Sequence, residues 1–278
     1  MSPERRNALL LLHITVLIWG FTGVLGRLIT LEAEALVWYR TLIGVLGLVV
    51  ASYILRFSIS WPRRHIMEYL ITGTVIAVHW VTFFGAIKAS TISVTLTCLS
   101  STTVFVALLE PLWYKRRIRP YELLIGLVVF GAILLIFQLE TEYRKGIVLA
   151  MISALGAAIF TVLNGKQVER DDAKRIALYE LGGAWAMLGV YMLASGTPLP
   201  LPQTLVLGDV FWLLILGLVC TSFAFVVGIA VMRQLSPFTV ALTVNLEPVY
   251  GIILALLFFG ESEHLKPGSY AGAGIILA

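Results

Sequence analysis

The chain has 278 residues, of which 59% are hydrophobic and only 13% are charged, and its mean hydropathy is +0.93. Soluble domains average roughly 25% charged residues, so this composition excludes a water-soluble globular protein. The net charge of +4 reflects basic residues in loops beside apolar runs, and the sequence shows no nucleic-acid footprint.

Apolar runs of about 20 residues follow one another along the chain, and each is long enough to cross the ~30 Å hydrocarbon core of a bilayer. The sequence therefore predicts an all-α integral membrane protein with ten transmembrane helices. Their expected positions are 8–30, 34–57, 66–88, 90–114, 121–139, 146–166, 175–196, 209–233, 236–260 and from about 267 onward. The last run holds only about a dozen residues, roughly 18 Å of helix, so we expect this helix to be incomplete as given. The first run is too long for a removable signal peptide and is interpreted as the first span.

The basic residues of the loops lie mostly on one side of the predicted membrane. Of the 20 Lys and Arg, 14 fall in loops on one side and four on the other, while Arg27 and Arg40 lie inside helices. Cytoplasmic loops carry an excess of Lys and Arg. The distribution therefore predicts that both termini are cytoplasmic.

The chain contains an internal recurrence. The segment Ser90–Thr97 returns 146 positions later as Ser236–Thr243, with four of eight residues identical. From the start of the first copy to the start of the second the chain crosses the bilayer five times, and an odd number of crossings inverts the second copy. We predict two five-helix repeats of opposite orientation, 1–141 and 142–278, within one membrane domain. Inverted repeats of this kind are typical of secondary transporters.

Three short motifs resemble those of a known family. They are Leu-Ile-Trp-Gly-Phe-Thr in the first span, Asn245–Tyr250 (Asn-Leu-Glu-Pro-Val-Tyr) in the ninth, and Phe259–Glu261 (Phe-Gly-Glu) at its end. With the ten predicted helices, they resemble the EamA type of the drug/metabolite transporter superfamily. The first half departs from this pattern, because Thr102 stands where Pro248 would align. The resemblance implies a multi-pass carrier of the bacterial inner membrane, with amino acids or related small metabolites as cargo.

Two ionisable side chains are predicted near the bilayer midplane. His79 lies ~20 Å from the inner end of its helix and Glu247 ~16 Å from the inner end of its own. A charge at that depth costs roughly 2.5–3.5 kcal/mol on insertion scales, so such residues are candidates for function. His79 either binds cargo or a proton, or is a neutral imidazole bonded to a neighbouring helix. Glu247 is the candidate for proton coupling or for pairing with an ammonium group, or else it bonds a backbone carbonyl freed by Pro248.

Other polar and aromatic residues complete the candidate site. Arg40 either holds a substrate carboxylate or pairs with Glu34 or Glu32. Glu180 lies close to an inner helix end, where we expect it to reach headgroups, loops or partner charges. The remaining substrate candidates are Trp19, Trp80, Trp185, Tyr39, Asn245, Tyr250 and Ser101. Pro248 and Pro111 are the predicted kink or hinge positions.

Catalysis is the competing class, but the sequence contains none of the catalytic, phosphate-binding or metal-binding motifs sought. We expect no enzyme activity, no cofactor and no metal site. The predicted function is alternating-access transport of a small amino acid or related metabolite. The predicted partners are lipid and a small-molecule substrate, and the choice between uniport and coupling to protons stays open. A channel or non-catalytic scaffold, or within carriers a drug, organic-cation or proton antiporter, stays open.

Overall fold

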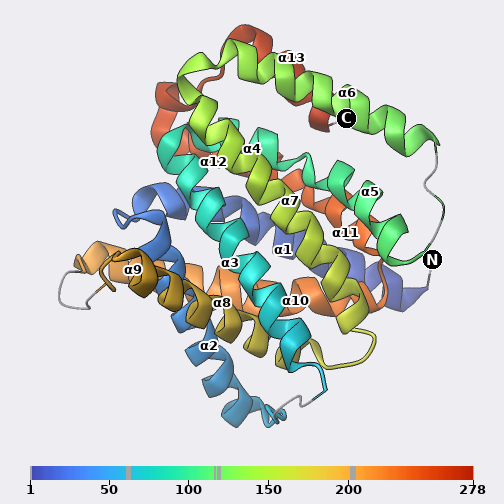
Figure 1. Ribbon diagram of the computed structural model, residues 1–278, viewed down its shortest axis with the longest axis vertical. Coiled ribbons are helices and arrows are strands. Elements are labelled where there is room, and N and C mark those ends of the chain that lie inside the picture. The colour runs from blue at the N-terminus through green and yellow to red at the C-terminus, as the bar shows by residue number, and fades with distance from the viewer. Residues whose placement is uncertain (1, 61–63, 116, 118–119, 201–204, 278) are drawn as a thin grey trace.

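The computed structural model describes residues 2–60, 64–115, 117, 120–200 and 205–277. Within these residues the regular structure is entirely helical, which confirms the all-α membrane fold. The helices pack into one bundle (Figure 1). They are α1 (Pro3–Leu28), α2 (Ala33–Leu55), α3 (Ile66–Ala89), α4 (Ile92–Leu99), α5 (Thr102–Trp113), α6 (Pro120–Leu139), α7 (Arg144–Gln167), α8 (Ala173–Ser195), α9 (Leu207–Ile215), α10 (Ala224–Ala230), α11 (Pro237–Val244), α12 (Leu246–Phe259) and α13 (Pro267–Leu277). Short 3-10 segments are η1 (Thr141–Tyr143), η4 (Val231–Arg233) and η5 (Gly260–Glu263), and η3 (Leu216–Phe223) is π-helical.

Eight helical stretches in the described part of the chain are long and apolar enough to cross a membrane. They are Pro3–Leu28, Ala33–Leu55, Ile66–Ala89, Ile92–Trp113, Thr141–Gln167, Ala173–Ser195, Leu207–Arg233 and Pro237–Glu263. Helices α6 and α13 occupy the ranges predicted for the fifth and tenth spans and pack against each other at one edge of the bundle (Figure 1). The count of ten spans stays a prediction.

Two predicted spans are interrupted at similar places. The fourth divides into α4 and α5, and the ninth divides into α11 and α12. Both α4 and α11 have eight residues and begin with a hydroxyl N-cap: Thr91 Oγ1 accepts from Val94 N, and Ser236 Oγ accepts from Thr239 N. Such caps satisfy backbone donors that the helix itself leaves free. The sequence recurrence therefore corresponds to two short helices that begin and end alike.

The packing partners of the helices can be exchanged between the halves. Helix α1 packs on α12 and α10, while α7 packs on α4 and α3. In an inverted repeat α1 would correspond to α7, the ninth span (α12) to the fourth (α4), and the eighth span (α10) to the third (α3). The contacts of α1 with α12 and α10 then correspond to the contacts of α7 with α4 and α3. Helices α2 and α8 would be counterparts of each other, as would α6 and α13, and each helix packs against its own counterpart. The inverted repeat stays a prediction, and this exchange supports it.

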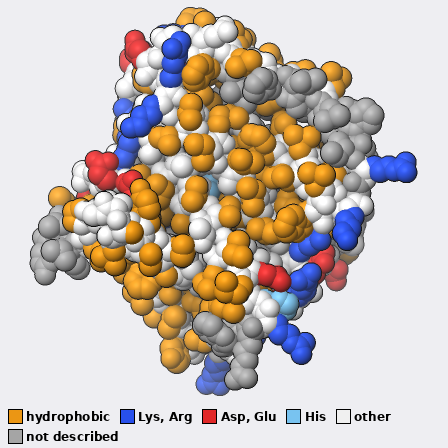
Figure 2. Space-filling model, in the orientation of Figure 1, with side chains coloured by type: hydrophobic (Ala, Val, Ile, Leu, Met, Phe, Trp, Pro, Cys, Tyr) orange, Lys and Arg blue, Asp and Glu red, His pale blue; other side chains and the backbone are white. Residues whose placement is uncertain are grey.

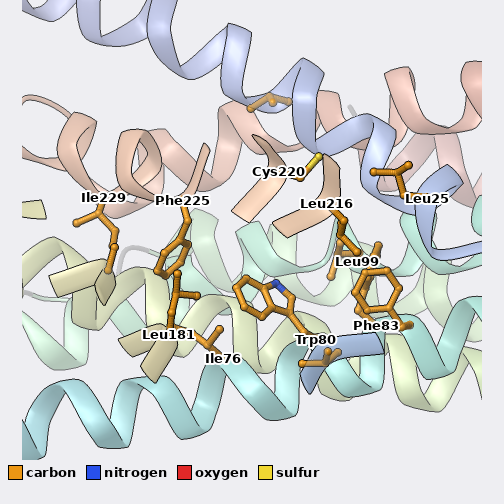
Figure 3. Close-up of a cluster of buried hydrophobic side chains, with 14 of the residues drawn as sticks. Leu25, Ile76, Trp80, Phe83, Leu99, Leu181, Leu216, Cys220, Phe225 and Ile229 are labelled. Carbon is orange, nitrogen blue, oxygen red and sulfur yellow. The ribbon is translucent and has the colours of Figure 1, made fainter. Parts of the chain in front are cut away.

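The apolar side chains divide between a core and an outer surface. Leu25, Ile76, Trp80, Leu216 and other buried residues from separate helices meet between α1, α3 and the η3 segment (Figure 3). Large apolar side chains also remain exposed and cover much of the visible surface (Figure 2), with Tyr53 77% and Leu257 76% exposed. An apolar surface of this extent marks contact with an apolar medium, which here is lipid.

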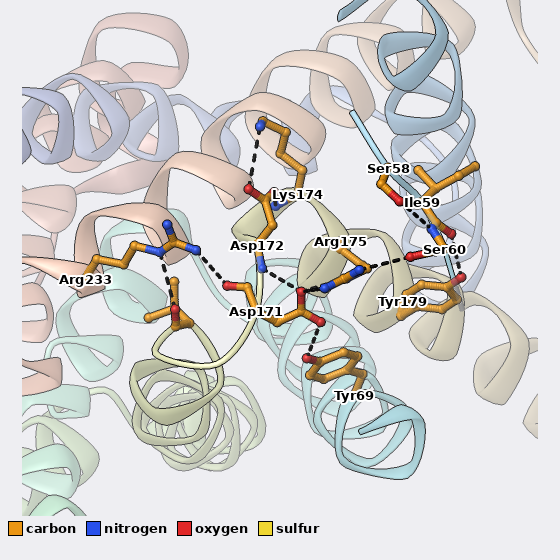
Figure 4. Close-up of polar contacts among 11 residues, drawn as sticks. Ser58, Ile59, Ser60, Tyr69, Asp171, Asp172, Lys174, Arg175, Tyr179 and Arg233 are labelled. Carbon is orange, nitrogen blue, oxygen red and sulfur yellow. Dashed lines mark hydrogen bonds and ion pairs between the residues drawn. The ribbon is translucent and has the colours of Figure 1, made fainter. Parts of the chain in front are cut away.

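A polar network fixes the short link between α7 and α8 (Figure 4). The Asp171 carboxylate accepts from Tyr69 Oη at 2.8 Å and from Arg175 Nε at 2.6 Å, and Arg233 Nη2 donates to the Asp171 carbonyl at 2.9 Å. Burial alone would raise the pKa of Asp171, but the hydrogen bonds from Arg175 and Tyr69 outweigh it and hold the pKa below its ordinary value. The ends of α3, α8 and η4 are thereby held together.

Candidate functional site: a cavity between the helices

A cavity of about 100 Å³ lies at the centre of the bundle, well above the ~10–15 Å³ that one water molecule requires. Its lining comes from α1, α2, α3, α7, α10 and both interrupted spans. Seven residues singled out in the sequence line it together: Trp19, Arg40, His79, Trp80, Asn245, Glu247 and Pro248. The structure thus brings to one place residues that are up to 229 positions apart in the sequence.

Arg40 is fully buried in the middle of α2, and its guanidinium is held without an ion pair. Nε and Nη2 donate to Thr221 Oγ1 at 3.0 and 2.8 Å. The guanidinium carbon lies 4.0 Å from the centre of the Trp80 ring, which provides a cation–π contact. Nη1 makes no hydrogen bond to any residue that the structure describes. The alternative pairing with Glu34 or Glu32 is wrong, because Arg40 points into the bundle interior.

Glu247 lines the same cavity from another helix. It occupies the first turn of α12, directly after the interruption at Asn245, and its side chain is 93% shielded by the fold. No ion pair involves Glu247 within the described residues. It is close enough to Arg40 for the two charges to interact. The cavity therefore carries one basic and one acidic group that are not paired directly with each other.

His79 contacts a neighbouring helix and also lines the cavity, and its binding of cargo or a proton stays a prediction. Nδ1 lies 2.8 Å from the Ser153 carbonyl, while Ser153 Oγ donates to the His79 carbonyl at 2.9 Å. Ser153 Oγ also lies 2.8 Å from Nδ1, so Nδ1 donates to the carbonyl in one tautomer and accepts from the hydroxyl in the other. The protonation of Nε2 follows from the tautomer. His79 is thus fixed to α7 and still lines the cavity.

Aromatic rings form much of the remaining wall. The ring centres of His79 and Phe160 are 5.3 Å apart, those of Trp80 and Phe225 5.9 Å, and those of Phe160 and Phe225 6.3 Å. Trp19 completes the wall from α1 and donates from Nε1 to the Cys220 carbonyl at 3.2 Å. These contacts preserve a broad apolar surface beside the two charged groups.

Five sequence-predicted residues lie outside the cavity lining. Trp185 packs against Trp38 with ring centres 5.7 Å apart. Tyr39 donates to the Pro200 carbonyl at 3.0 Å. Ser101 donates to the Cys98 carbonyl at 2.7 Å. Tyr250 packs where α12 meets Gly20 of α1, and Pro111 lies inside α5 near its C-terminal end.

Several lining residues were not identified from the sequence. They are Phe160, Phe225, Asn164, Thr22 and Thr161, among others. No charge at depth marks them. Thr22 ends the Leu-Ile-Trp-Gly-Phe-Thr motif but is one of many hydroxyl residues in the spans. A Phe in an apolar span usually contacts lipid or core. Thr221, which holds Arg40, was also missed. It lies in the π-helical η3 segment and donates to Leu216 five residues earlier at 2.7 Å. Short π-helical segments often occur at functional sites.

Beyond the lining residues, at the two ends of the helices that surround the cavity, carboxylates cap other helices, and we refer to these places as the cavity ends. At what we call the Glu263 end, where α1 and α12 finish and α4 begins, Glu263 accepts from Ser93 N at 2.9 Å and forms an ion pair with Arg27. At the opposite Glu110 end, where α5 finishes and α11 begins, Glu110 Oε2 accepts from Phe238 N at 2.8 Å. The cavity lining reaches Met232 and Val240, toward the Glu110 end.

No group of three or more His, Cys, Asp and Glu able to hold a metal occurs in the residues the structure describes. Cys98 and Cys220 are both buried and free. The chemistry of the cavity is therefore provided by the charged, hydroxyl and aromatic side chains described above.

The chain is similar to known transporters over its whole length. The model of the EamA-like transporter family matches residues 6–138 and again 144–278. The uncharacterized transporter YxxF of Bacillus subtilis (strain 168) is 22% identical over 287 residues, which cover 99% of this chain and 88% of that protein. An uncharacterized transporter of Archaeoglobus fulgidus is 27% identical over 291 residues, covering 96% and 93%. A crystal structure of a protein 16% identical in sequence shares the fold, with a TM-score of 0.69 over 98% of this chain and 95% of the other.

Proposed function

The chain belongs to the EamA-like transporter family, and on that premise we propose that it carries a small amino acid across the membrane by alternating access. Transport itself follows from the family. The choice of cargo rests on the central cavity, and the mechanism rests on the contacts at the cavity's two ends.

The observation that carries the choice of cargo is the pair of opposite charges in one apolar cavity. Arg40 and Glu247 both line it, and Nη1 of Arg40 is left without a hydrogen bond. A guanidinium binds a carboxylate through two parallel hydrogen bonds. Glu247 provides the complementary acceptor for an ammonium group. A zwitterionic amino acid satisfies both, and its apolar side chain would contact Trp80, Phe160 and Phe225.

Phosphorylated cargo fits this cavity less well. A dianionic phosphate requires several cations in a site shielded from water. Arg40 and His79 are the basic residues among the described lining, and Glu247 adds a negative charge. We therefore rank amino acids above sugar phosphates and nucleotide sugars.

Alternating access is the mechanism that the cavity ends support. The Glu263 end is held by contacts that join three spans, while the lining extends toward the Glu110 end. From the loop charges we infer that the Glu110 end faces the cytoplasm, with both termini on that side of a bacterial inner membrane. In this proposal, cargo enters from one end while the other is closed, and the halves then exchange roles.

Counter-flow in proteoliposomes tests the proposal. Vesicles loaded with an unlabelled amino acid should take up the same labelled amino acid against its concentration gradient if the chain is a carrier. A panel of amino acids with apolar side chains, their decarboxylated amines and sugar phosphates identifies the cargo class. A channel lets label equilibrate without accumulation, and a scaffold gives no uptake beyond empty vesicles. Better exchange of sugar phosphates than of amino acids would overturn the ranking.

A further inference from the structure

A second carboxyl group is buried away from the Arg40–Glu247 pair. Glu180 of α8 has no exposed surface, and neither carboxyl oxygen has a partner in full hydrogen-bond geometry among the described residues. The expectation that it reaches headgroups, loops or partner charges is wrong. It lies where α3 and α8 approach most closely, because a Cβ on Gly73 would meet the Glu180 backbone. An ionised carboxylate without a partner is strongly unfavourable at such a position.

The nearest polar partner of Glu180 is an amide that also faces the cavity. Asn164 of α7 is fully buried, lines the cavity and lies close enough to Glu180 to interact with it. Among the described residues, neither Oδ1 nor Nδ2 of Asn164 has a partner in full hydrogen-bond geometry, so its contact with Glu180 is close but not well aligned. One turn further along α7, Gln167 Nε2 donates to Thr72 Oγ1 at 2.8 Å. The carboxyl group thus lies among uncharged amides and hydroxyls.

A protonated carboxyl group has the donor that this arrangement lacks. A carboxylic acid can donate its O–H to Asn164 Oδ1 and accept from Asn164 Nδ2, which would satisfy all four unpaired atoms. The ionised form has only acceptors, so Asn164 Oδ1 would stay without a donor. The pairing chemistry therefore favours the neutral acid.

The charged and titratable groups around Glu180 are occupied elsewhere. From α3, Tyr69 is the nearest, and its hydroxyl donates to Asp171. Arg175, in the first turn of α8, pairs with Asp171. Arg40 of α2 binds Thr221. Helix α7 offers the uncharged Asn164 and Gln167, and α10 contains no titratable residue.

We propose that Glu180 and Asn164 form a proton-binding site beside the cavity, in which the Glu180 carboxylate takes up one proton to give the acid paired with the Asn164 amide. Because Asn164 also lines the cavity, a change in the cavity wall alters this pair, and loss of the proton disturbs the wall. The route to the Glu110 end runs past Tyr69 to Asp171, which lines a surface hollow with Arg175 and Arg233. Coupling to transport rests on the proposed function, whereas proton binding does not.

Infrared spectroscopy of the purified full-length protein tests the site without any cargo. A protonated carboxyl group gives a carbonyl band separate from that of carboxylates, and it disappears when the group ionises. We expect Glu180→Gln to remove one such component, and the matched variant Glu247→Gln to leave that component in place. Asn164→Leu should shift the component to higher frequency, because a hydrogen bond to its carbonyl is lost.

Several results would overturn this assignment. One is an unchanged carboxylic acid band in folded Glu180→Gln protein, with folding checked by size-exclusion chromatography. Another is an unshifted band in Asn164→Leu. This variant still tests the Glu180–Asn164 pair if Glu180→Gln does not fold. A third is loss of the band when sodium chloride replaces choline chloride at constant pH, since the group would then bind a metal cation. The infrared tests can fail while counter-flow still shows transport. Counter-flow can likewise fail while the infrared tests still show proton binding by Glu180.

Discussion

Arg40 shows how one buried charge can be held without being neutralised. Its guanidinium rests on the Trp80 ring and donates to a single hydroxyl, Thr221 Oγ1, while Nη1 has no hydrogen bond. Cation–π contact contributes about 2 kcal/mol or more when the groups are desolvated, which is less than the cost of burying an unpaired ion. The remaining cost would be offset when a carboxylate binds.

Replacing Arg40 should separate amino acids from amines. We expect Arg40→Gln to reduce counter-flow of the amino acid at least tenfold, since a charge-assisted hydrogen bond contributes about 1.5–3 kcal/mol. Exchange of the corresponding decarboxylated amine should fall much less. Initial uptake rates in proteoliposomes measure both. Equal losses for acid and amine would show that Arg40 supports the fold rather than the carboxylate.

Glu247 should carry the proton dependence of transport at the cargo site. We expect Glu247→Gln to exchange amino acid more slowly, because the ammonium group loses its charged acceptor, and with a weaker dependence of the rate on pH, because the amide cannot titrate. Glu261→Gln is the matched control, since its carboxylate is 98% exposed just beyond α12. Retention of the wild-type pH profile in Glu247→Gln would remove Glu247 from coupling.

Asp171 should make stability depend on pH in acid. Its pKa is lowered in the fold, so its contribution is complete above the ordinary aspartate pKa of about 3.9 and is lost as the pH falls through the lowered value. Asp171→Asn should therefore lower Tm in detergent at neutral pH, and the difference from wild type should shrink below about pH 4. Exposed Glu169→Gln should leave Tm unchanged. A constant Asp171→Asn difference across pH would contradict the ion-pair account.

Sequence reasoning at this scale found the ionisable residues and missed the neutral ones. Arg40, His79 and Glu247 stand out because charges at depth are rare, and all three line the cavity. Phe160 and Phe225 look like any other apolar residue in a span. The depth estimate for Glu180 placed it near a helix end, but a neighbouring helix covers that end. Burial depends on which helices pack there, and a single sequence does not show this.

At the scale of the helices, Gly73 sets the distance between α3 and α8. An added Cβ would lie 2.9 Å from Ala184 N and even closer to the Glu180 carbonyl oxygen. Both neighbours are backbone atoms, so neither can rotate away as a side chain would. The helices would have to separate, and Glu180 and Asn164 would move with them.

The expected consequence is a large penalty for one methyl group. Gly73→Ala should lower Tm in detergent by several degrees, because overpacking costs typically ~1–3 kcal/mol even where side chains can adjust. Gly182→Ala in α8 is the matched control, since nothing lies within 4 Å of its added Cβ. Thermal unfolding measured by intrinsic fluorescence compares the two. Similar Tm values for both variants would show that α3 and α8 can separate freely.

Helix positions were predictable, but their internal breaks were not. Continuous apolar runs gave eight spans with ends close to those observed, because length and hydropathy alone define them. The interruption between α4 and α5 has no proline at its own position, and the π-helical η3 has no marker beyond its small and hydroxyl residues. Such breaks arise where neighbouring helices satisfy the freed backbone groups.

For the molecule as a whole, the two cavity ends use the same device. In each, a carboxylate from the end of one interrupted span accepts from the N-terminus of the other: Glu263 from Ser93, and Glu110 from Phe238. Helix N-termini favour negative charge, so each contact is stabilising. Opening either end requires one such contact to break, which gives the proposed rocking motion a definite first step.

Weakening the Glu263 contact should expose the cavity from that end. The reporter is a single cysteine placed at the lining position Thr22, in a protein from which Cys98 and Cys220 have been removed. A membrane-impermeant maleimide is added at the Glu263 end. We expect Glu263→Gln to increase the labelling of this cysteine. The variant loses the ion pair with Arg27, whereas the exposed Glu261→Gln does not. Labelling yield in oriented vesicles is the measurement. If both variants label equally, the Glu263 contact does not control access.

The Glu263 contact also bears on how the carrier divides its time between conformations in the absence of cargo. Each 1.4 kcal/mol that it contributes makes the state closed at that end about tenfold more populated. Cargo that binds both states equally leaves this ratio unchanged, however tight its binding. The occupancy of the two states without cargo would then be set by the Glu263 contact at the edge of the molecule and not by the cavity. This occupancy would determine on which side of the membrane the cavity is open when cargo arrives.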